Sequence, residues 1–93
     1  MASAKGERLL NVFMSLEAHP LIGISNKEIA ERLNIKPVDV SRDLKDLVDT
    51  GLVQKLDNGN YSYSIKTLQI AERFRRDQQR IKERLSEIEK RLY

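Results

Sequence analysis

The stretch Ser25–Leu47 constrains the fold of this 93-residue chain more than any other part. It reads SNKEIAERLNIKPVDVSRDLKDL. Ser25 followed by Glu28 has the spacing of a capping box, which begins a helix. Asn34 suits a helix end because asparagine tolerates the left-handed conformation, and Pro37 suits the first turn of the next helix. The stretch therefore predicts two short helices joined by a tight turn.

The two predicted helices span residues 26–33 and 37–50, and each has one apolar side. The apolar positions are Ile29, Ala30 and Leu33 in the first helix and Val40, Leu44, Leu47 and Val48 in the second. The other side of the second helix is mostly polar. Two helices with a turn of this length form a helix-turn-helix, and such a second helix fits the major groove of DNA.

A β-hairpin is predicted directly after the second helix. Residues 52–56 and 61–65 have the composition of strands, and the second run alternates apolar or aromatic with small polar residues. Residues 57–60 read Asp-Asn-Gly-Asn, and Asn-Gly supplies the positive φ values that tight hairpins require. A hairpin after three helices gives the order of a winged helix-turn-helix, in which the hairpin is the wing.

Residues 3–18 predict the first helix, which His19-Pro20 ends because the residue before proline avoids the α region. Its main apolar stripe comprises Leu9, Val12, Phe13 and Leu16. Leu10 and Met14 form a second apolar strip beside that stripe. This strip either widens the surface that faces the core or meets the C-terminal helix or a partner subunit. Residues 21–24 are either a brief edge strand or a buried connector.

Residues 67–93 contain neither Gly nor Pro and predict one long helix. Its apolar residues alternate three and four positions apart, which is the heptad pattern of a coiled coil. The a positions are Ala71, Gln78, Leu85 and Leu92, and the d positions are Phe74, Ile81 and Ile88. The predicted fold is mostly α with a small β-hairpin: a winged helix-turn-helix domain (residues 1–66) followed by an oligomerisation helix (residues 67–93).

The charges beside this heptad seam favour self-association as a homodimer. The g positions are Asp77, Arg84 and Arg91, and the e positions are Arg75, Lys82 and Glu89. In a parallel dimer Asp77 meets Lys82 and Arg84 meets Glu89, and both pairs are opposite in sign. A tetramer, an antiparallel pairing and packing of the seam on Leu10 and Met14 of the same chain stay open.

Composition excludes several other classes of protein. The chain has no cysteine, so it has neither disulfides nor a thiolate metal site. No apolar run approaches a membrane span, and the start MASAKGER lacks the apolar region of a signal peptide. A cytoplasmic protein is expected. No arrangement typical of catalysis, of a metal, of a cofactor or of a small-molecule site is found, and His19 has no partner at metal-ligand spacing.

The net charge of +3 is unevenly distributed. Residues 1–66 contain nine Lys/Arg and nine Asp/Glu, whereas residues 67–93 contain eight and five. The basic residues that cluster on the C-terminal helix are Arg73, Arg75, Arg76, Arg80, Lys82 and Arg84. They either form ordinary coiled-coil surface or add phosphate contacts. The electrostatic footprint expected of nucleic-acid binding is therefore weak in the helix-turn-helix itself.

The runs SNKEIAERLNIKPVDVSRDLKDLVDTGLVQK and GNYSYSI together resemble the winged-helix DNA-binding domain of IclR-type transcriptional regulators. GERLLNVFMSL is similar to the first helix of that family, and the resemblance covers roughly residues 4–72. It implies a DNA-binding regulator in which Arg42 matches an arginine of the family. The large effector-binding domain of the family is absent, so a standalone regulator, or a module that docks elsewhere, is expected. Pro37-Val38-Asp39 also departs from the small polar and basic residues usual there.

Positions on the predicted helix-turn-helix and wing assign candidate roles in binding double-stranded DNA. Arg42 can contact a guanine bidentately or clamp a phosphate, and Ser25 and Lys27 lie where a helix N-terminus binds phosphate. The candidate DNA-binding residues are Ser25, Lys27, Lys36, Val38, Asp39, Ser41, Arg42, Lys45, Lys55, Asn58, Gly59 and Asn60. The predicted function is a dimeric, sequence-specific transcriptional regulator, a repressor at a pseudo-palindromic site.

A second hypothesis is a winged-helix module for protein interaction or assembly, because a fold does not determine a function. It is motivated by the neutral charge of residues 1–66 and by the acidic residues of the second helix of the pair. Those residues are Asp39, Asp43, Asp46 and Asp49, which we expect to be solvated charges. Salt-dependent binding to duplex DNA would discriminate the two hypotheses.

Overall fold

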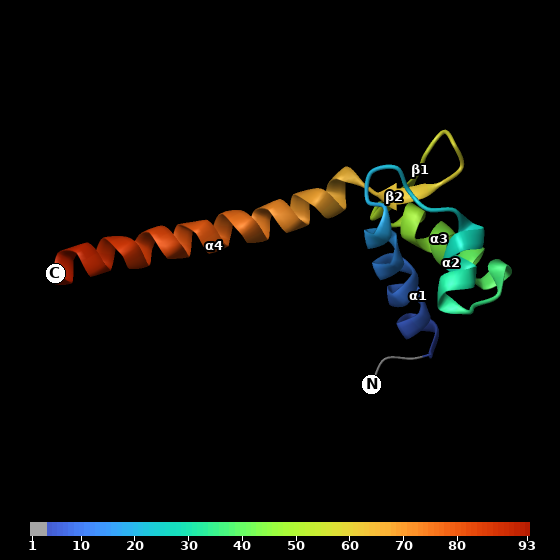
Figure 1. Ribbon diagram of the computed structural model, residues 1–93, viewed down its shortest axis with the longest axis horizontal. Helices are drawn as coiled ribbons and strands as arrows, with labels where there is room; N and C mark the ends of the chain where they lie inside the picture. The colour runs from blue at the N-terminus through green and yellow to red at the C-terminus, as the bar shows by residue number, and fades with distance from the viewer. Residues whose placement is uncertain (1–3) are drawn as a thin grey trace.

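The computed structural model describes residues 4–93, so Ser3, the first residue of the first predicted helix, lies outside the described residues. Its elements are α1 (Ala4–Ser15), the short 3₁₀ helix η1 (Leu16–Ala18), α2 (Asn26–Leu33), α3 (Pro37–Asp49), β1 (Val53–Lys55), β2 (Tyr61–Tyr63) and α4 (Ile65–Leu92). The three short helices and the hairpin form a small head, residues 4–64, from which α4 projects (Figure 1). The predicted fold class is confirmed.

The core of the head lies between α1, α2, α3 and the first strand. Its buried apolar side chains are Val12, Leu16, Ile24, Ile29, Ala30, Val40, Leu44, Leu47 and Val53. Leu9 and Phe13 pack against this cluster from α1, so the predicted stripe of the first helix is confirmed. The apolar core residues of α3, Val40, Leu44 and Leu47, are three or four positions apart, which places them on one face of that helix. The core therefore fixes α3 against α1 and α2 and leaves the other side of α3 exposed.

The wing is a two-stranded antiparallel hairpin in which Gln54 lies opposite Ser62. Ile24 adds an isolated bridge to its outer edge, because the N–H groups of Ile24 and Tyr61 each donate to the carbonyl of the other residue, at 3.0 and 2.9 Å. Of residues 21–24, only Ile24 therefore pairs as the predicted edge strand would. Ile24 is also buried, as a connector would be.

The turn of the wing differs from the predicted Asn-Gly turn, which would need positive φ at both residues. Only Gly59 has a positive φ there, +86°. Asn58 instead accepts a hydrogen bond on its side-chain oxygen from the N–H of Asn60 at 2.9 Å. The N–H of Leu56 closes the loop by donating to the Asn60 carbonyl at 2.7 Å, so the turn is one residue longer than a tight hairpin.

The second strand ends at Tyr63, and the prediction that it continues to Ile65 is wrong. Ser64 caps α4, since its hydroxyl accepts from the N–H of Thr67 at 3.4 Å. The Ser64 N–H donates to the Leu52 carbonyl at 3.0 Å, and the Thr67 hydroxyl donates to the same carbonyl at 2.7 Å. These bonds turn the chain into a helix at Ile65, two residues before the predicted start.

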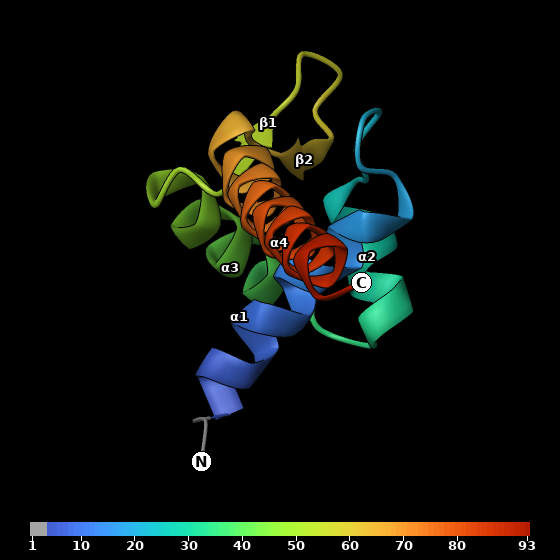
Figure 2. The ribbon, with the colours of Figure 1, turned by 90° about the vertical axis from the view of Figure 1, so that its left-hand side faces the viewer.

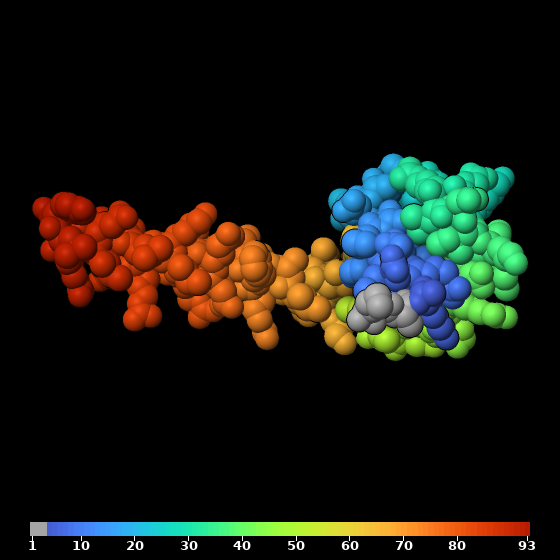
Figure 3. All heavy atoms as spheres, turned by 90° about the horizontal axis from the view of Figure 1, so that it is seen from below, coloured from blue at the N-terminus to red at the C-terminus, as the bar shows by residue number. Residues whose placement is uncertain are grey.

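No residue of α4 is buried, and its large apolar side chains face solvent. Figures 1 and 3 show this helix standing clear of the head along most of its length, and Figure 2 looks along α4 toward the head. Phe74 is 71% exposed and Ile88 is 46% exposed. Packing of the seam on the same chain, one of the open alternatives, is therefore not observed.

The strip of Leu10 and Met14 on α1 does not face the core, so that interpretation is wrong. Leu10 is 56% exposed and Met14 is 54% exposed, because the neighbouring residues Leu9 and Phe13 already fill the α1 side of the core. Among residues 4–93, no helix combines the length and the apolar character that crossing a membrane requires.

Candidate nucleic-acid interface

The helix-turn-helix has the local geometry that its sequence predicts. The Ser25 side chain accepts from the Glu28 N–H at 3.1 Å and caps α2. Asn34 ends α2 with φ 54° and ψ 49°, the left-handed conformation. Lys36 is the N-cap of α3 and Pro37 is its first residue. A turn of three residues, Asn34 to Lys36, therefore separates the two helices.

An ion pair that spans 35 residues of sequence attaches α3 to α1. Arg8 donates through Nε to Asp43 Oδ2 at 2.7 Å and through a second nitrogen to Asp43 Oδ1 at 3.0 Å. Asp43 is fully buried, so the expectation that it is a solvated surface charge is wrong. The hydrogen bond to Asp43 raises the pKa of Arg8. The pair fixes the rotation of α3 about its axis and turns its opposite side outward.

That outward side carries Val38, Arg42 and Lys45, which fall on one stripe at 3.6 residues per turn. All three side chains are exposed. The Arg42 side chain makes no hydrogen bond or ion pair within residues 4–93. Its guanidinium group therefore has all of its donors available for a ligand.

The other candidate residues of α3 already have partners. The Asn26 side-chain amide donates to the Ser41 hydroxyl at 2.7 Å and links α2 to α3. Lys45 forms an ion pair of 3.2 Å with Asp49, one turn later. Asp39 lies 3.8 Å from a guanidinium nitrogen of Arg8, at the edge of the stripe. Contacts of these side chains with DNA remain predictions.

One lysine lies at the start of each helix of the pair. Lys27 lies in the first turn of α2, and Lys36 is the N-cap of α3. Both are exposed, and neither side chain has an ion-pair partner in the part of the chain that the structure describes. The Ser25 hydroxyl oxygen accepts the capping bond, and its own O–H donor is still available to a ligand. With Arg42, the lysines place three unpaired cations around the turn, where helix N-termini also favour anions.

The tip of the wing and the α2–α3 turn both lie on the side of the head away from α4 (Figure 1). Asn58 and Gly59 are exposed at this tip, whereas Asn60 is half-buried. Lys55 lies over the ring of Tyr61, with its ammonium nitrogen 5.8 Å from the ring centroid. α4 therefore covers neither the tip of the wing nor the α2–α3 turn.

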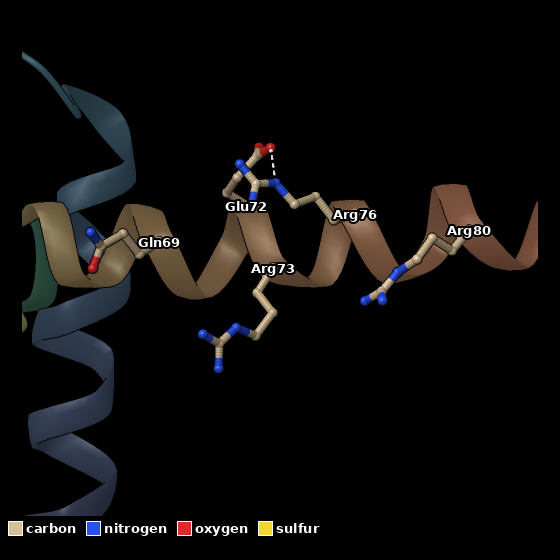
Figure 4. A pocket seen from close by; sticks show the side chains of 5 residues that line it. All are labelled: Gln69, Glu72, Arg73, Arg76 and Arg80. Atoms are coloured by element: carbon tan, nitrogen blue, oxygen red, sulfur yellow. Dashed lines mark hydrogen bonds and ion pairs between the residues drawn. The ribbon is translucent and has the colours of Figure 1, made fainter.

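A second group of basic residues lies on α4, away from the head. Figure 4 shows a shallow concavity there, with Arg73 and Arg80 directed to one side and Arg76 folded toward Glu72. Hydrogen bonds from Arg75 and Arg76 lower the pKa of Glu72 to about 2, with Arg75 the larger cause. Arg73 has no side-chain partner among residues 4–93. The concavity is open on a single helix, so we do not assign a small-molecule site to it.

Sequence reasoning missed two residues that shape this surface. Arg8 gave no local signal, because its partner Asp43 lies on another helix. Asn26 could have been noticed, since a polar residue at the start of α2 is positioned to contact the next helix. Among residues 4–93, no group of three or more His, Asp or Glu side chains is arranged to hold a metal ion.

The three-helix head, the three-residue turn and the hairpin after α3 define a winged helix-turn-helix protein. A solved structure with this fold is CymR (YrzC), described as the global cysteine regulator of B. subtilis, which superposes with a TM-score of 0.61 at 26% sequence identity. The match covers 68% of this chain and 50% of the CymR chain. No family model and no curated protein matches the chain. The likeness supports the winged-helix part of the resemblance but not its IclR-type assignment.

Proposed function

We propose that the protein is a sequence-specific DNA-binding transcription regulator that acts as a homodimer. In this proposal α3 enters the major groove, the wing contacts the adjacent backbone or minor groove, and α4 joins two copies. The observation that carries it is the exposed, unpaired Arg42 in the middle of the outward stripe of α3. The likeness to a regulator with the same fold supports the class of function.

The charge of α3 is less unfavourable to DNA than its sequence implies. Asp43 is buried against Arg8, and Asp39 lies beside the same guanidinium group. Asp49 is paired with Lys45. Arg42, Lys27 and Lys36 have no acidic partner within residues 4–93. Residues 1–66 have zero net charge, and Asp46 of α3 is exposed and forms no ion pair within residues 4–93. The available cations Arg42, Lys27 and Lys36 nevertheless support binding to phosphate.

Homodimerisation through α4 would give the protein two reading helices. The apolar seam of α4 is not covered by any other part of residues 4–93, and its large residues are exposed by 46% or more. Two heads related by a two-fold axis match a pseudo-palindromic site, with half-sites about 34–36 Å apart or a multiple of that spacing. A repressor is the simplest form of such a regulator, because occupying a site is sufficient to exclude other proteins from it.

Selection of bound sequences from random duplex DNA tests this proposal directly. We expect a pseudo-palindromic consensus, and we expect Arg42→Ala to weaken its binding by about 5- to 150-fold, the equivalent of roughly 1–3 kcal/mol. Arg76→Ala is the matched control. It removes the same charge from α4 on the side away from the seam, and it should leave specific binding nearly unchanged.

Equal losses in Arg42→Ala and Arg76→Ala, or a selection without any consensus, would contradict sequence-specific reading by α3. Binding should also weaken linearly with the logarithm of salt concentration, with a slope that counts the phosphates neutralised.

The second candidate function, a module for protein interaction or assembly, is favoured by the zero net charge of residues 1–66. It predicts no measurable binding to duplex DNA even at low salt. Capture of protein partners by the wild type, and their loss when Val38 and Arg42 are replaced, would then favour this function.

A further inference from the structure

We propose that two copies of α4 pair in parallel, with Gln78 facing Gln78 of the second copy, so that both heads lie at the same end of the coiled coil. This inference rests on the homodimer proposed above and adds its orientation. α4 has 28 residues and is therefore about 42 Å long at 1.5 Å per residue. Antiparallel pairing would place the two heads at opposite ends of that length.

The charges that flank the seam distinguish the two orientations. In the parallel register, Asp77 meets Lys82 of the second copy and Arg84 meets its Glu89, and symmetry makes each pair twice. No like charges face each other in that register. The Lys82, Arg84 and Glu89 side chains form no ion pair within residues 4–93, so they are available to a second copy. Asp77 forms an ion pair with Arg80 of its own helix and would exchange this exposed partner for Lys82 of the second copy.

In an antiparallel pair, each a position of one helix faces a d position of the other. Two alignments of this kind bring most of the seam residues of the two copies into contact. In the first, Ala71 faces Ile88, and Asp77 then attracts Arg84 while Arg75 repels Lys82. In the second, Gln78 faces Ile88. Asp77 then attracts Arg91 and Arg75 attracts Glu89, while Arg84 and Lys82 each face the same residue of the second copy. Both antiparallel alignments therefore contain like-charged pairs that the parallel register avoids.

The single polar residue of the seam leads to the same orientation. In the parallel register, the two Gln78 amides face each other, and each can donate to the carbonyl oxygen of the other. In the antiparallel alignments, Gln78 lies against Ile81 or Ile88, where its amide would be buried without a partner. A polar residue at one a position specifies register in coiled coils. The occupant of the seam is thus a second copy of this chain.

Cysteine cross-linking can test the orientation because the chain contains no cysteine. We expect Ile88→Cys alone to form a disulfide-linked homodimer under mild oxidation, observed by non-reducing electrophoresis. Equimolar mixtures of Ala71→Cys with Ile88→Cys, and of Gln78→Cys with Ile88→Cys, should give homodimers in preference to heterodimers. Preferential heterodimers in either mixture would overturn the parallel orientation.

A charge reversal supplies an independent readout. Glu89→Arg should raise the dimer Kd about fivefold or more by placing like charges at both symmetric pairs. Adding Arg84→Glu should restore the wild-type Kd in the parallel dimer only, and failure of this rescue would overturn the parallel register. Sedimentation of the wild type separates the two proposals: a monomer would overturn the homodimer itself, whereas a dimer with heterodimeric cross-links would overturn only its orientation.

Discussion

Arg8 on α1 holds the fully buried carboxylate of Asp43 on α3 with two hydrogen bonds, of 2.7 and 3.0 Å. This contact links the first helix to the proposed reading helix across the core. Removing one partner of such a pair leaves a buried charge without compensation, which is far costlier than losing an exposed pair. The same arginine also lies near Asp39, so one side chain offsets two carboxylates on α3.

Arg8→Ala is expected to lower Tm by at least about 5 °C, measured by circular dichroism, because Asp43 would then be buried without its partner. Arg32→Ala is the control. Arg32 pairs with Glu28 one turn away, at 3.0 Å and with both side chains more than 40% exposed. Its loss should change Tm little. Equal Tm values for the two variants would contradict a structural role of the Arg8–Asp43 pair.

Two glycines with positive φ should respond differently to alanine. At Gly59, at the tip of the wing, φ is +86° and nothing lies within 4 Å of an added Cβ. Gly59→Ala should therefore cost only the backbone strain, about 1–2 kcal/mol. At Gly23, φ is +79°, and the Cβ would lie 2.9 Å from Asn60 Cβ and 3.0 Å from the Tyr61 carbonyl oxygen.

Gly23→Ala should consequently destabilise the head more than Gly59→Ala does, and it should disturb the bridge between Ile24 and Tyr61. Urea unfolding of the two variants measures the difference. A smaller loss for Gly23→Ala would mean that the loop before α2 can move away from the wing.

The hydroxyl of Tyr63 donates to the carbonyl of Phe13 at 2.8 Å. The rings of these two residues pack edge to face, with their centroids 5.0 Å apart. Tyr63→Phe should destabilise the head by about 0.5–1.5 kcal/mol, as expected for one hydrogen bond. Burial is the largest cause that raises the pKa of Tyr63 above its ordinary value of 10.0.

A raised pKa means that the folded state prefers the protonated phenol. The stability that Tyr63 contributes is therefore fully present below pH 10 and is lost as the pH rises through the higher pKa of the folded state. Unfolding curves between neutral and strongly alkaline pH should show this loss in the wild type, and Tyr63→Phe should show less of it. Identical alkaline slopes in both proteins would contradict the assignment to Tyr63.

Ile81→Lys should convert the proposed homodimer to a monomer, because it places a charge in the middle of the α4 seam. Sedimentation velocity measures the change. Gln79→Lys adds the same charge on the opposite side of α4, where Gln79 contacts Glu83 at 3.2 Å, and it should remain dimeric. Dissociation by both substitutions would implicate overall charge rather than the seam, and a monomeric wild type would contradict the dimer.

Local rules predicted the helix-turn-helix correctly, because Ser25, Asn34 and Pro37 each act on the backbone within one turn of themselves. The capping bond of Ser25 and the left-handed Asn34 are present as expected. Asp43 could not be placed in the same way. Its carboxylate is buried by a residue 35 positions earlier, and no local pattern distinguishes it from the exposed Asp46.

The strand-to-helix boundary after Tyr63 was misplaced for a related reason. Ser62 and Ser64 occupy equivalent places in an alternating run, yet Ser62 is buried in the wing and Ser64 caps α4. The carbonyls of Gly51 and Leu52 decide the difference, since they accept hydrogen bonds from Ser64. In the candidate site, the sequence indicated Arg42, but the partners of Asp39 and Ser41 come from other helices and could not be predicted from local spacing.

Ser64 is the only residue between the wing and α4, and its hydrogen bonds to the carbonyls of Gly51 and Leu52 restrain the backbone at this junction. A torque applied to α4 must therefore reach the wing directly. One extra base pair between two half-sites rotates one of them by about 35° around the duplex axis. Two heads held by such stiff junctions could not follow that rotation, so the phase of the DNA helix, as well as its sequence, would select the binding site.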